Sequence, residues 1–392
     1  MRICGLIVEY NPLHVGHMHH IKEAQRLTQA DLTVAVMSSH VVQRGDFAVV
    51  DKFTRTQWAL KSGIDLVIEL PAFYVLQSAD AFADAAVTLL HAVGVTDVVF
   101  GSESSDIAPL YKALKLYHDA QFQLDVKAHL DAGKSYASAH GLAFEARGLS
   151  ALNQPNNMLG LQYLKAIENH GFAIQAHAIK RLESGYHDGF DAQKNIQSAT
   201  AIRNQLFDHQ PLQNSVASFV QESLERLPLN RLEHYQDGLN ILLRTLSATH
   251  LESLFSIDEG LENRLQKTPF DGALFAYLEA LKTPRYTYAK LRRSLMHVLC
   301  QTPKTFQSYP SPPYVRILGM NVHGQKQLNI IKKNPTLPII TKLTRERHPL
   351  LDYELKVTQL YALKTSAKLN DKEFAPCIRT TLKDPLVSAI MT

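Results

Sequence analysis

The stretch Ile3-Cys-Gly-Leu-Ile-Val-Glu-Tyr-Asn-Pro-Leu-His-Val-Gly-His17 decides how the rest of the chain is interpreted. Its first part, Ile3–Val8, is a short apolar run of the kind found in fully buried strands. Pro12 and Gly16 then indicate a tight turn, and His17–Leu27 has the character of a helix. A buried strand followed at once by a helix predicts the first unit of a parallel sheet covered by helices.

The same alternation continues along the N-terminal half of the chain. Further short strands are expected at Leu32–Met37, Leu66–Leu70, Asp97–Phe100 and Ala173–Ala178, and further helices at Lys52–Ser62, Ala79–Val93 and Ile107–His118. Because crossovers between parallel strands are right-handed, the expected fold class is α/β, with a Rossmann-like doubly wound parallel sheet. Ligands bind such sheets at the carboxyl ends of the strands, so the loops after Val8, Met37 and Phe100 should meet at one edge.

The length of 392 residues exceeds what one ordinary core holds, so two domains are expected. We place their boundary in Asp208-His-Gln-Pro-Leu, giving residues 1–208 to the sheet domain with the ligand site. Residues 209–392 are expected to form a mainly helical, basic C-terminal region. Within it, a strand at Tyr314–Leu318, a helix at Gly324–Asn334 and a strand at Leu337–Thr341 are expected.

The composition is that of a soluble globular protein, with 45% hydrophobic and 20% charged residues. Three widely spaced cysteines, Cys4, Cys300 and Cys377, argue against a disulfide framework and suit a reducing compartment. The sequence has neither a signal-peptide pattern at its start nor an apolar run long enough to span a bilayer. A cytoplasmic protein without membrane contacts is therefore expected.

The turn His14-Val-Gly-His17 carries the chemistry that the sequence predicts. A helix that begins there directs its free N–H groups and positive dipole end toward a ligand, and Gly16 lets a nucleotide approach the backbone. His14 and His17 could both reach phosphate oxygens and neutralise the charge that grows on an α-phosphate and on departing pyrophosphate. This predicts nucleotidyl transfer with two catalytic histidines.

Two other interpretations of these histidines were weighed. A short His-x-Gly-His string can arise by chance on a surface turn. Together with His19 and His20 it could also suggest a metal site, but no carboxylate or cysteine has an obvious ligand spacing. The position of the string, between the first strand and a helix, favours nucleotide binding; the identity of any metal ligand stays open.

Other residues at the expected ligand edge suit a nucleotide as well. Gly101, after the fourth strand, could leave room for adenine or ribose, although a plain turn would explain it equally. Asn156 and Asn157 stand at a helix start, where asparagine is a favoured N-cap.

Four further polar residues are candidates for contacts to phosphate or to a second substrate. Gln43 and Arg44 lie in the polar loop after the second strand. Ser198 lies at the start of a later helix, and Arg203 lies one turn into it. Arginine offers a forked donor that matches phosphate oxygens. Each of the four could also be an ordinary solvated residue.

Several motifs in a fixed order carry a family resemblance. The His-x-Gly-His turn, with the later Ser198-Ala-Thr-Ala-Ile-Arg203, resembles the HxGH nucleotidyltransferase superfamily of adenylyltransferases. The whole series resembles the bacterial tRNA(Met) cytidine acetate ligase family over roughly residues 1–205. The motifs are Val8–His17, Gln43–Gly45, Asp65–Pro71, Phe100–Glu103, Pro155–Asn157 and Tyr186–Asp188.

This resemblance implies a reaction and a set of ATP contacts. Members of that family activate acetate with ATP, giving acetyl-adenylate and pyrophosphate, and transfer the acetyl group to N4 of the wobble cytidine of elongator tRNA(Met). Mg²⁺ is expected to accompany the triphosphate. The ATP contacts implied are Ile7, Val8, Glu9, Tyr10, Asn11, Pro12, Leu13, His14, Val15, Gly16, His17, Met18, His19, His20, Gly101, Asn156 and Arg181.

The segment between Lys282 and Arg347 suggests an RNA partner. It is rich in lysine and arginine, has Glu346 as its only acidic residue, and contains interleaved aromatics. Such a surface attracts phosphates and stacks bases, whereas the alternative is a solvated basic face over core aromatics. The candidate tRNA contacts are Lys290, Arg292, Arg293, Lys332 and Lys333.

Two other functions remain open at this point. An adenylyltransferase for a small phosphorylated metabolite would share the histidine turn without needing a basic C-terminal half. A nucleotide-dependent RNA-binding protein without catalysis would bind ATP but release no pyrophosphate. Neither the oligomeric state nor the tRNA identity determinants can be predicted from the sequence.

Overall fold

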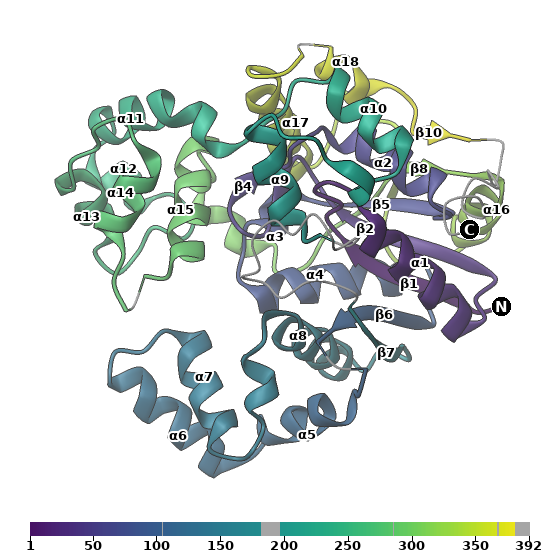
Figure 1. The fold of residues 1–392 in the computed structure, drawn as a ribbon, viewed down its shortest axis with the longest axis horizontal. Helices are drawn as coiled ribbons and strands as arrows, with labels where there is room; N and C mark the ends of the chain where they lie inside the picture. The colour runs from purple at the N-terminus through teal and green to yellow at the C-terminus, as the bar shows by residue number, and fades with distance from the viewer. Residues whose placement is uncertain (104, 182–196, 285, 367, 381–392) are drawn as a thin grey trace.

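The computed structural model describes residues 1–103, 105–181, 197–284, 286–366 and 368–380. At its centre lies a parallel sheet with the strand order β5-β2-β1-β6-β7 (Figure 1). These strands are β1 (Ile3–Val8), β2 (Leu32–Ser38), β5 (Leu66–Leu70), β6 (Asp97–Ser102) and β7 (Gln175–Lys180). The order confirms the predicted Rossmann-like α/β fold, and β1 and β5 occupy the predicted residues.

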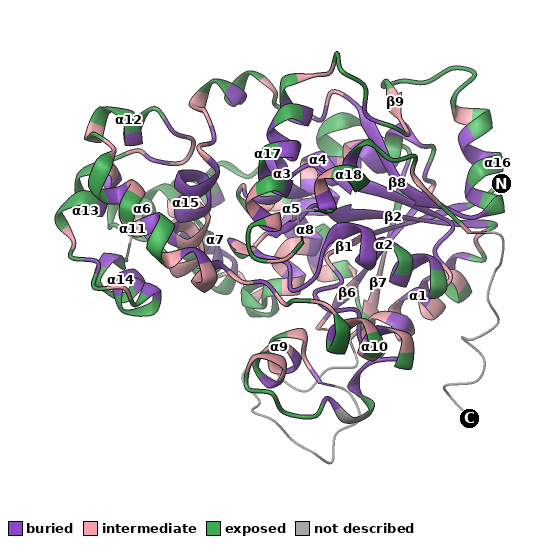
Figure 2. Cartoon of the chain, turned by 90° about the horizontal axis from the view of Figure 1, so that it is seen from above, coloured by how far each residue is buried: buried purple, intermediate pink, exposed green. Residues whose placement is uncertain are grey.

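Helices cover both faces of this sheet, as its uniformly buried strands require (Figure 2). Apolar residues of α4 (Ala79–Ala92) and α8 (Pro155–His170) belong to the core on one face. Those of α1 (Val15–Thr28) and α2 (Lys52–Lys61) belong to the core on the other. Position 5 of β1 suits glycine, because a Cβ atom there would lie only 2.8 Å from Val95 Cγ1.

Strands from the C-terminal part of the chain extend the sheet beyond β5. β8 (Val315–Met320) pairs antiparallel with β5, and both β9 (Ile339–Ile340) and β10 (Ile378–Arg379) pair with β8. The whole sheet is therefore mixed, because an antiparallel strand from the C-terminal part is added to the predicted parallel sheet. β8 protects the edge of β5, which would otherwise present unpaired backbone groups. The predicted boundary near residue 208 stays a prediction, but any division must leave β8 and β10 with the N-terminal strands.

The remaining elements form three helical groups around the sheet (Figure 1). After β6 come α5 (Ala108–Leu116), α6 (Ala120–Asp131), α7 (Tyr136–Glu145) and the 3-10 turn η1 (Ser150–Asn153). A helical lobe, residues 236–300, comprises α11 (Gln236–Thr245), α12 (Ala248–Glu252), α13 (Leu261–Lys267), α14 (Leu274–Leu281) and α15 (Tyr288–Cys300). The third group comprises α9 (Ala199–Phe207), α10 (Ser218–Arg226), α17 (Pro349–Ala362) and α18 (Leu369–Phe374).

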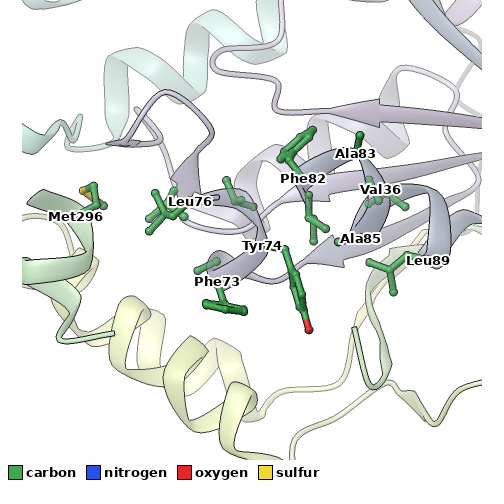
Figure 3. Close-up of a cluster of buried hydrophobic side chains, with 14 of the residues drawn as sticks. Val36, Phe73, Tyr74, Leu76, Phe82, Ala83, Ala85, Leu89 and Met296 are labelled. Carbon is green, nitrogen blue, oxygen red and sulfur yellow. The ribbon is translucent and has the colours of Figure 1, made fainter. Parts of the chain in front are cut away.

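Shorter elements complete the chain. They are the hairpin β3 (Val41–Val42) and β4 (Asp46–Phe47), α3 (Ala72–Val75), η2 (Gln213–Ser215), η3 (Leu232–Tyr235), η4 (Lys304–Ser308) and α16 (Val322–Ile331). Figure 3 shows buried side chains of β2, α3 and α4, with Met296 of α15 at their edge. The ring of His297 holds α15 there, because its Nε2 lies 3.1 Å from the carbonyl oxygen of Leu76.

All three cysteines are free, and Cys4 and Cys300 are buried. Among the described residues, no helix is both long and apolar enough to cross a membrane.

A cluster of five buried charged residues joins the C-terminal elements to the sheet. Lys52 Nζ lies 2.8 Å from Glu373 and 2.5 Å from Glu69, and the guanidinium of Arg316 pairs with the same two carboxylates. Glu354 completes the cluster, 3.8 Å from Lys52. The sequence analysis counted Arg316 in a basic surface, whereas its side chain is only 6% exposed. The residues belong to α2, β5, β8, α17 and α18, so the cluster connects elements that lie far apart in sequence.

The two carboxyl groups of α17 and α18 have opposite pKa shifts. Burial and the neighbouring Glu69 raise the pKa of Glu354 to about 8. Burial also opposes ionisation of Glu373, but Lys52 and Arg316 outweigh it and bring the pKa of Glu373 far below its usual range. At neutral pH, Glu354 is thus mainly protonated, while Glu373 is a carboxylate that balances the buried cations.

Glu354→Gln should change the free energy of unfolding at pH 7 by less than about 1 kcal/mol, because glutamine preserves a neutral hydrogen-bonding group. Glu373→Gln should cost about 3–5 kcal/mol, because it leaves buried positive charge unbalanced. Urea denaturation of the two variants measures both values. Equal losses would contradict the assigned protonation states.

The raised pKa of Glu354 predicts that the stability of the protein depends on pH. The pKa of Glu354 is raised from its ordinary value of 4.5 to about 8 in the folded protein. At pH values between these two, folding is therefore accompanied by the uptake of a proton. Its contribution to stability therefore declines as pH rises through this window. Glu354→Gln should remove that decline from a series of urea denaturation curves, whereas an unchanged slope would contradict it.

Candidate nucleotide-binding site

The histidine turn forms a reciprocal cap at the start of α1. His14 is the N-cap residue, with extended backbone angles, and its Nδ1 accepts a hydrogen bond from the Gly16 N–H at 3.1 Å. In return, the His14 N–H donates to Nδ1 of His17 at 3.3 Å. This is the arrangement of a capping box, built here from two imidazoles. Because both Nδ1 atoms accept, each neutral ring carries its proton on Nε2 and offers it as a donor.

The two rings stack on one another, with centroids 3.8 Å apart, and Tyr10 meets His17 edge-on. Removal from water, together with the charge of Arg181, lowers the pKa of His14 to about 3 and that of His20 to about 4. It brings the pKa of His17 well below its usual value. These shifts favour the uncharged form of each ring, so the rings would act on phosphate as hydrogen-bond donors, and their catalytic role stays a prediction.

Positive charge reaches the turn from Arg203 instead. Its Nη1 donates to the carbonyl oxygen of Asn11 at 2.9 Å, and its Nη2 donates to Thr200 Oγ1. Ser198 caps α9 by accepting from the Ala201 N–H at 3.2 Å, which fixes the helix that carries Arg203. The structure thus brings Ser198 and Arg203 to the turn from almost two hundred residues away.

A second part of the site is organised by Glu103, which belongs to one of the sequence motifs but had no predicted role. Its carboxylate accepts from the backbone N–H groups of Asn156 and Asn157 at the start of α8. The N-cap of α8 is Gln154, so the expectation that Asn156 or Asn157 caps this helix is corrected. Instead, Asn156 Oδ1 accepts from Arg181 Nη1 at 2.6 Å.

Gly101 makes room for Arg181. A Cβ atom at Gly101 would lie 2.9 Å from Arg181 Cγ. In the free protein this glycine therefore accommodates a protein side chain, and the expected space for adenine or ribose is occupied by the arm of Arg181. The same arginine lowers the pKa values of His14, His17 and His20. The two parts of the site follow the neighbouring strands β1 and β6, which pair in parallel.

The loop of the β3–β4 hairpin reaches the end of β1. The N–H of Gln43 donates to Glu9 Oε1 at 2.7 Å. Arg44 is exposed and lies close enough to Arg181 to contribute to lowering its pKa, after the larger effect of burial. Gln43 and Arg44 thus belong to the edge where the motif lies, as the topology predicted.

Arg55 is a second residue that the sequence analysis missed. It is fully buried, and its Nη1 donates to the carbonyl oxygen of Glu9 at 2.7 Å and to Ser38 Oγ at 3.1 Å. Burial lowers its pKa to about 10. Its guanidinium therefore joins the carboxyl ends of β1 and β2. An arginine in the middle of an amphipathic helix gave no signal of this role.

Two buried polar atoms in the motif have no hydrogen-bond partner within the described part of the chain. They are Tyr10 Oη and His20 Nε2. Buried polar atoms are normally satisfied, so atoms without partners beside a helix N-terminus suit a site that a polar ligand completes.

The candidate tRNA contacts do not form one surface. Lys290, Arg292 and Arg293 lie on α15, whereas Lys332 and Lys333 follow the end of α16 at the opposite end of the molecule (Figures 1 and 2). The interleaved aromatics Tyr286, Phe306 and Tyr314 are buried in the core.

Their individual environments also differ. The side chain of Arg292 is 12% exposed and pairs with Asp46 at 2.6 Å and with Glu233 at 3.0 Å. Lys290 pairs with Asp258, while Lys332 and Lys333 are exposed. The tRNA contacts therefore stay predictions, although Arg292 is already bound by two carboxylates while Lys332 and Lys333 are exposed.

Among the described residues, no group of three or more His, Cys, Asp or Glu side chains is arranged to hold a metal ion. The carboxylates of Glu9 and Glu103, which follow β1 and β6, accept hydrogen bonds from backbone N–H groups. The expected Mg²⁺ would therefore depend largely on phosphate oxygens for its ligands. Tyr186–Asp188 lies outside the described residues.

A Rossmann-like sheet whose first strand leads into a His-x-Gly-His helix start defines a nucleotidyl transferase. The family model described as HIGH Nucleotidyl Transferase matches residues 1–375, so the match covers nearly the whole chain. It extends well beyond the N-terminal strands and includes the helical lobe.

Comparison with similar proteins identifies the family within the nucleotidyl transferases. The chain is 36% identical over 405 residues to the tRNA(Met) cytidine acetate ligase of Oceanobacillus iheyensis, covering 99% of this chain and all of that protein. It is 36% identical to that of Bacillus subtilis, covering 93% and 92%. The apo crystal structure of Thermotoga maritima TmcAL superposes with a TM-score of 0.88 at 31% identity, covering 97% and 100%. A second TmcAL structure, with α-thio ATP bound, gives 0.85. The chain belongs to the tRNA(Met) cytidine acetate ligase family.

The neutral state of these histidines can be tested directly. Because the pKa values of His14, His17 and His20 all lie far below the usual value, their imidazole signals should stay those of neutral rings from pH 8 to pH 5. Histidine-selective NMR, assigned with single substitutions, measures this. A midpoint between pH 6 and 7 for His14 would contradict the burial of its ring.

His14 has a matched pair of substitutions. Asparagine is a good N-cap, so His14→Asn should keep the fold while losing the Nε2–H donor and at least about 100-fold in rate. His14→Ala should lose the donor and also about 1 kcal/mol of stability. Urea denaturation and acetate-dependent pyrophosphate exchange separate the two effects. An active His14→Asn variant would remove His14 from catalysis.

Proposed function

We propose that the protein activates acetate with ATP and transfers the acetyl group to N4 of the wobble cytidine of elongator tRNA(Met). The observation that carries this proposal is the reciprocal cap of His14 and His17. It directs two Nε2–H donors and the start of α1 to the edge where a Rossmann-like sheet binds ligands. Support for acetate and tRNA(Met) comes from the names of the similar proteins.

ATP would lie across the carboxyl ends of β1 and β6. The segment Ile7–His20 would wrap it, with Gly101, Asn156 and Arg181 on the far side. Arg181 would have to move from Gly101 or share that space with the nucleotide. The bound α-thio ATP of the Thermotoga maritima structure supports a nucleotide site in this fold.

In the first step, an acetate oxygen attacks the α-phosphorus of ATP, the bond to the β-phosphate oxygen breaks, and pyrophosphate leaves. Acetate is ionised at pH 7, so no strong base is required. The neutral histidines would donate hydrogen bonds to the α-phosphate oxygens, and Arg181 and Arg203 would balance the charge on the leaving group. Mg²⁺, when bound to the triphosphate, would supply further charge stabilisation.

In the second step, the exocyclic amine of cytidine attacks the carbonyl carbon of acetyl-adenylate. AMP leaves with the bridging oxygen, and the amine loses a proton. Positioning of the amine can account for much of the rate. The wobble base lies in a loop, so the enzyme need not open a duplex. We place the reaction in the cytoplasm, where ATP and tRNA occur together.

His17→Ala should abolish formation of the adenylate while leaving the fold and the affinity for tRNA near those of the wild type. His17 contributes one donor to the reaction and one acceptor to the helix cap, so the loss of stability should stay near 1 kcal/mol. Acetate-dependent exchange of pyrophosphate into ATP, with tRNA binding measured in parallel, checks this. Full activity would show that the catalytic assignment is wrong.

The overall reaction is tested by nucleoside mass spectrometry. Unmodified elongator tRNA(Met) is incubated with the protein, ATP, Mg²⁺ and isotopically labelled acetate. Labelled N4-acetylcytidine should form only with ATP. Pyrophosphate without labelled nucleoside would keep the transfer chemistry but overturn the acceptor, and the absence of both would favour a non-catalytic RNA-binding protein.

A further inference from the structure

The loop between β3 and β4 is attached to the helical lobe at its back. Arg292 Nε donates to the carbonyl oxygen of Gly45 at 3.2 Å, and Arg293 Nη1 donates to that of Gln43 at 3.4 Å. The two adjacent arginines of α15 therefore hold the backbone on either side of Arg44.

The backbone of the β3–β4 loop packs directly against the backbone of α15 at Gly45. A Cβ atom at Gly45 would lie 2.4 Å from the backbone nitrogen of Arg293, and the φ angle of Gly45 is +76°. Both the contact and the conformation require glycine at this position. The loop cannot shift toward α15, and the two arginine bonds oppose movement away from it.

Ion pairs fix the orientation of Arg292. Asp46 follows Gly45 and pairs with Arg292, while Glu233 of η3 pairs with the other end of the same guanidinium. Asp46 Oδ1 also accepts from the Leu232 N–H at 2.7 Å. The loop is thus attached to both η3 and α15.

The front of the loop faces the nucleotide site. The Gln43 N–H donates to Glu9 Oε1 at 2.7 Å, just after the end of β1, and the exposed Arg44 is the next residue of the loop. A displacement of the loop would therefore change the position of a cation at the site and release the side chain of Glu9.

We propose that Arg292 and Arg293 are positioning residues, which hold the Gln43–Gly45 loop so that Arg44 is presented to the bound nucleotide. They act through Arg44 and do not themselves contact ATP or tRNA. The inference rests on the proposed function and deepens it, because it assigns the helical lobe a part in forming the adenylate before any RNA binds.

The test uses acetate-dependent pyrophosphate exchange, which needs no tRNA. Arg293→Gln and Gly45→Ala should each lower kcat/KM for ATP by about 10- to 100-fold, as expected for a displaced catalytic loop. Arg44→Gln should cause a similar loss. Arg293→Lys, which keeps a donor, should recover part of the activity lost in Arg293→Gln. Arg244→Gln, an exposed arginine of α11 in the same lobe, is the matched control and should exchange like the wild type.

A double-mutant cycle distinguishes positioning from general weakening of the fold. If Arg293 acts through Arg44, the double variant Arg44→Gln/Arg293→Gln should lose little more than either single variant. The affinity of Arg293→Gln for tRNA, and its salt dependence, should stay within about twofold of the wild type. Urea denaturation verifies that each variant is folded. If Arg293→Gln is unstable, Gly45→Ala is used in its place, because it removes no ion pair.

Two results would overturn the inference. Additive losses in the cycle would show that Arg293 and Arg44 act independently. Normal exchange by Arg293→Gln, with weaker tRNA binding and a lower salt slope, would make Arg293 an RNA contact. A wild-type protein without any exchange would instead overturn the proposed function itself.

Discussion

Two hydrogen bonds between His14, Gly16 and His17 organise the site on which the rest of the account depends. Each imidazole satisfies a backbone N–H at the start of α1 through its Nδ1 atom. The same bonds fix the tautomer of each ring and leave Nε2–H as the donor. In the proposed mechanism, the arrangement that caps α1 is therefore also the one that presents the two donors.

The charges of the site come from other parts of the chain. The histidines are neutral, whereas Arg181 and Arg203 arrive from β7 and α9. In the proposed reaction, neutral donors and arginine cations together would suit the movement of charge from the α-phosphate to pyrophosphate. The buried cluster around Lys52 serves a different purpose, because it joins α17 and α18 to the sheet that carries the site.

The local parts of this structure could be predicted from the sequence. The strands β1 and β5 and the helix after His14 follow from apolar runs and turn residues that lie next to one another. The resemblance also directed attention to Asn156 and Arg181, which the structure joins by a hydrogen bond. The Rossmann-like fold class followed from the alternation of buried strands and helices, whereas the strand order was not predicted.

Interactions between distant segments could not be predicted in this way. The pairing of β8 with β5 spans about 250 residues, and the cap that Glu103 provides to α8 spans more than 50. Arg292 and Arg316 have the composition of a basic surface, and only their buried partners distinguish them from solvent-exposed residues. A count of basic residues in one segment therefore does not show which of them are paired with acidic residues from distant segments.

The central claim is that acetate is activated by bonding one of its oxygens to the α-phosphorus of ATP. Acetate labelled with ¹⁸O in both oxygens tests it most directly, with mass spectrometry of the AMP and the nucleosides formed from tRNA(Met). The account predicts one ¹⁸O atom in AMP for every acetyl group transferred to cytidine, because the bridging oxygen leaves with AMP. Acetylated cytidine accompanied by unlabelled AMP would contradict an acetyl-adenylate intermediate.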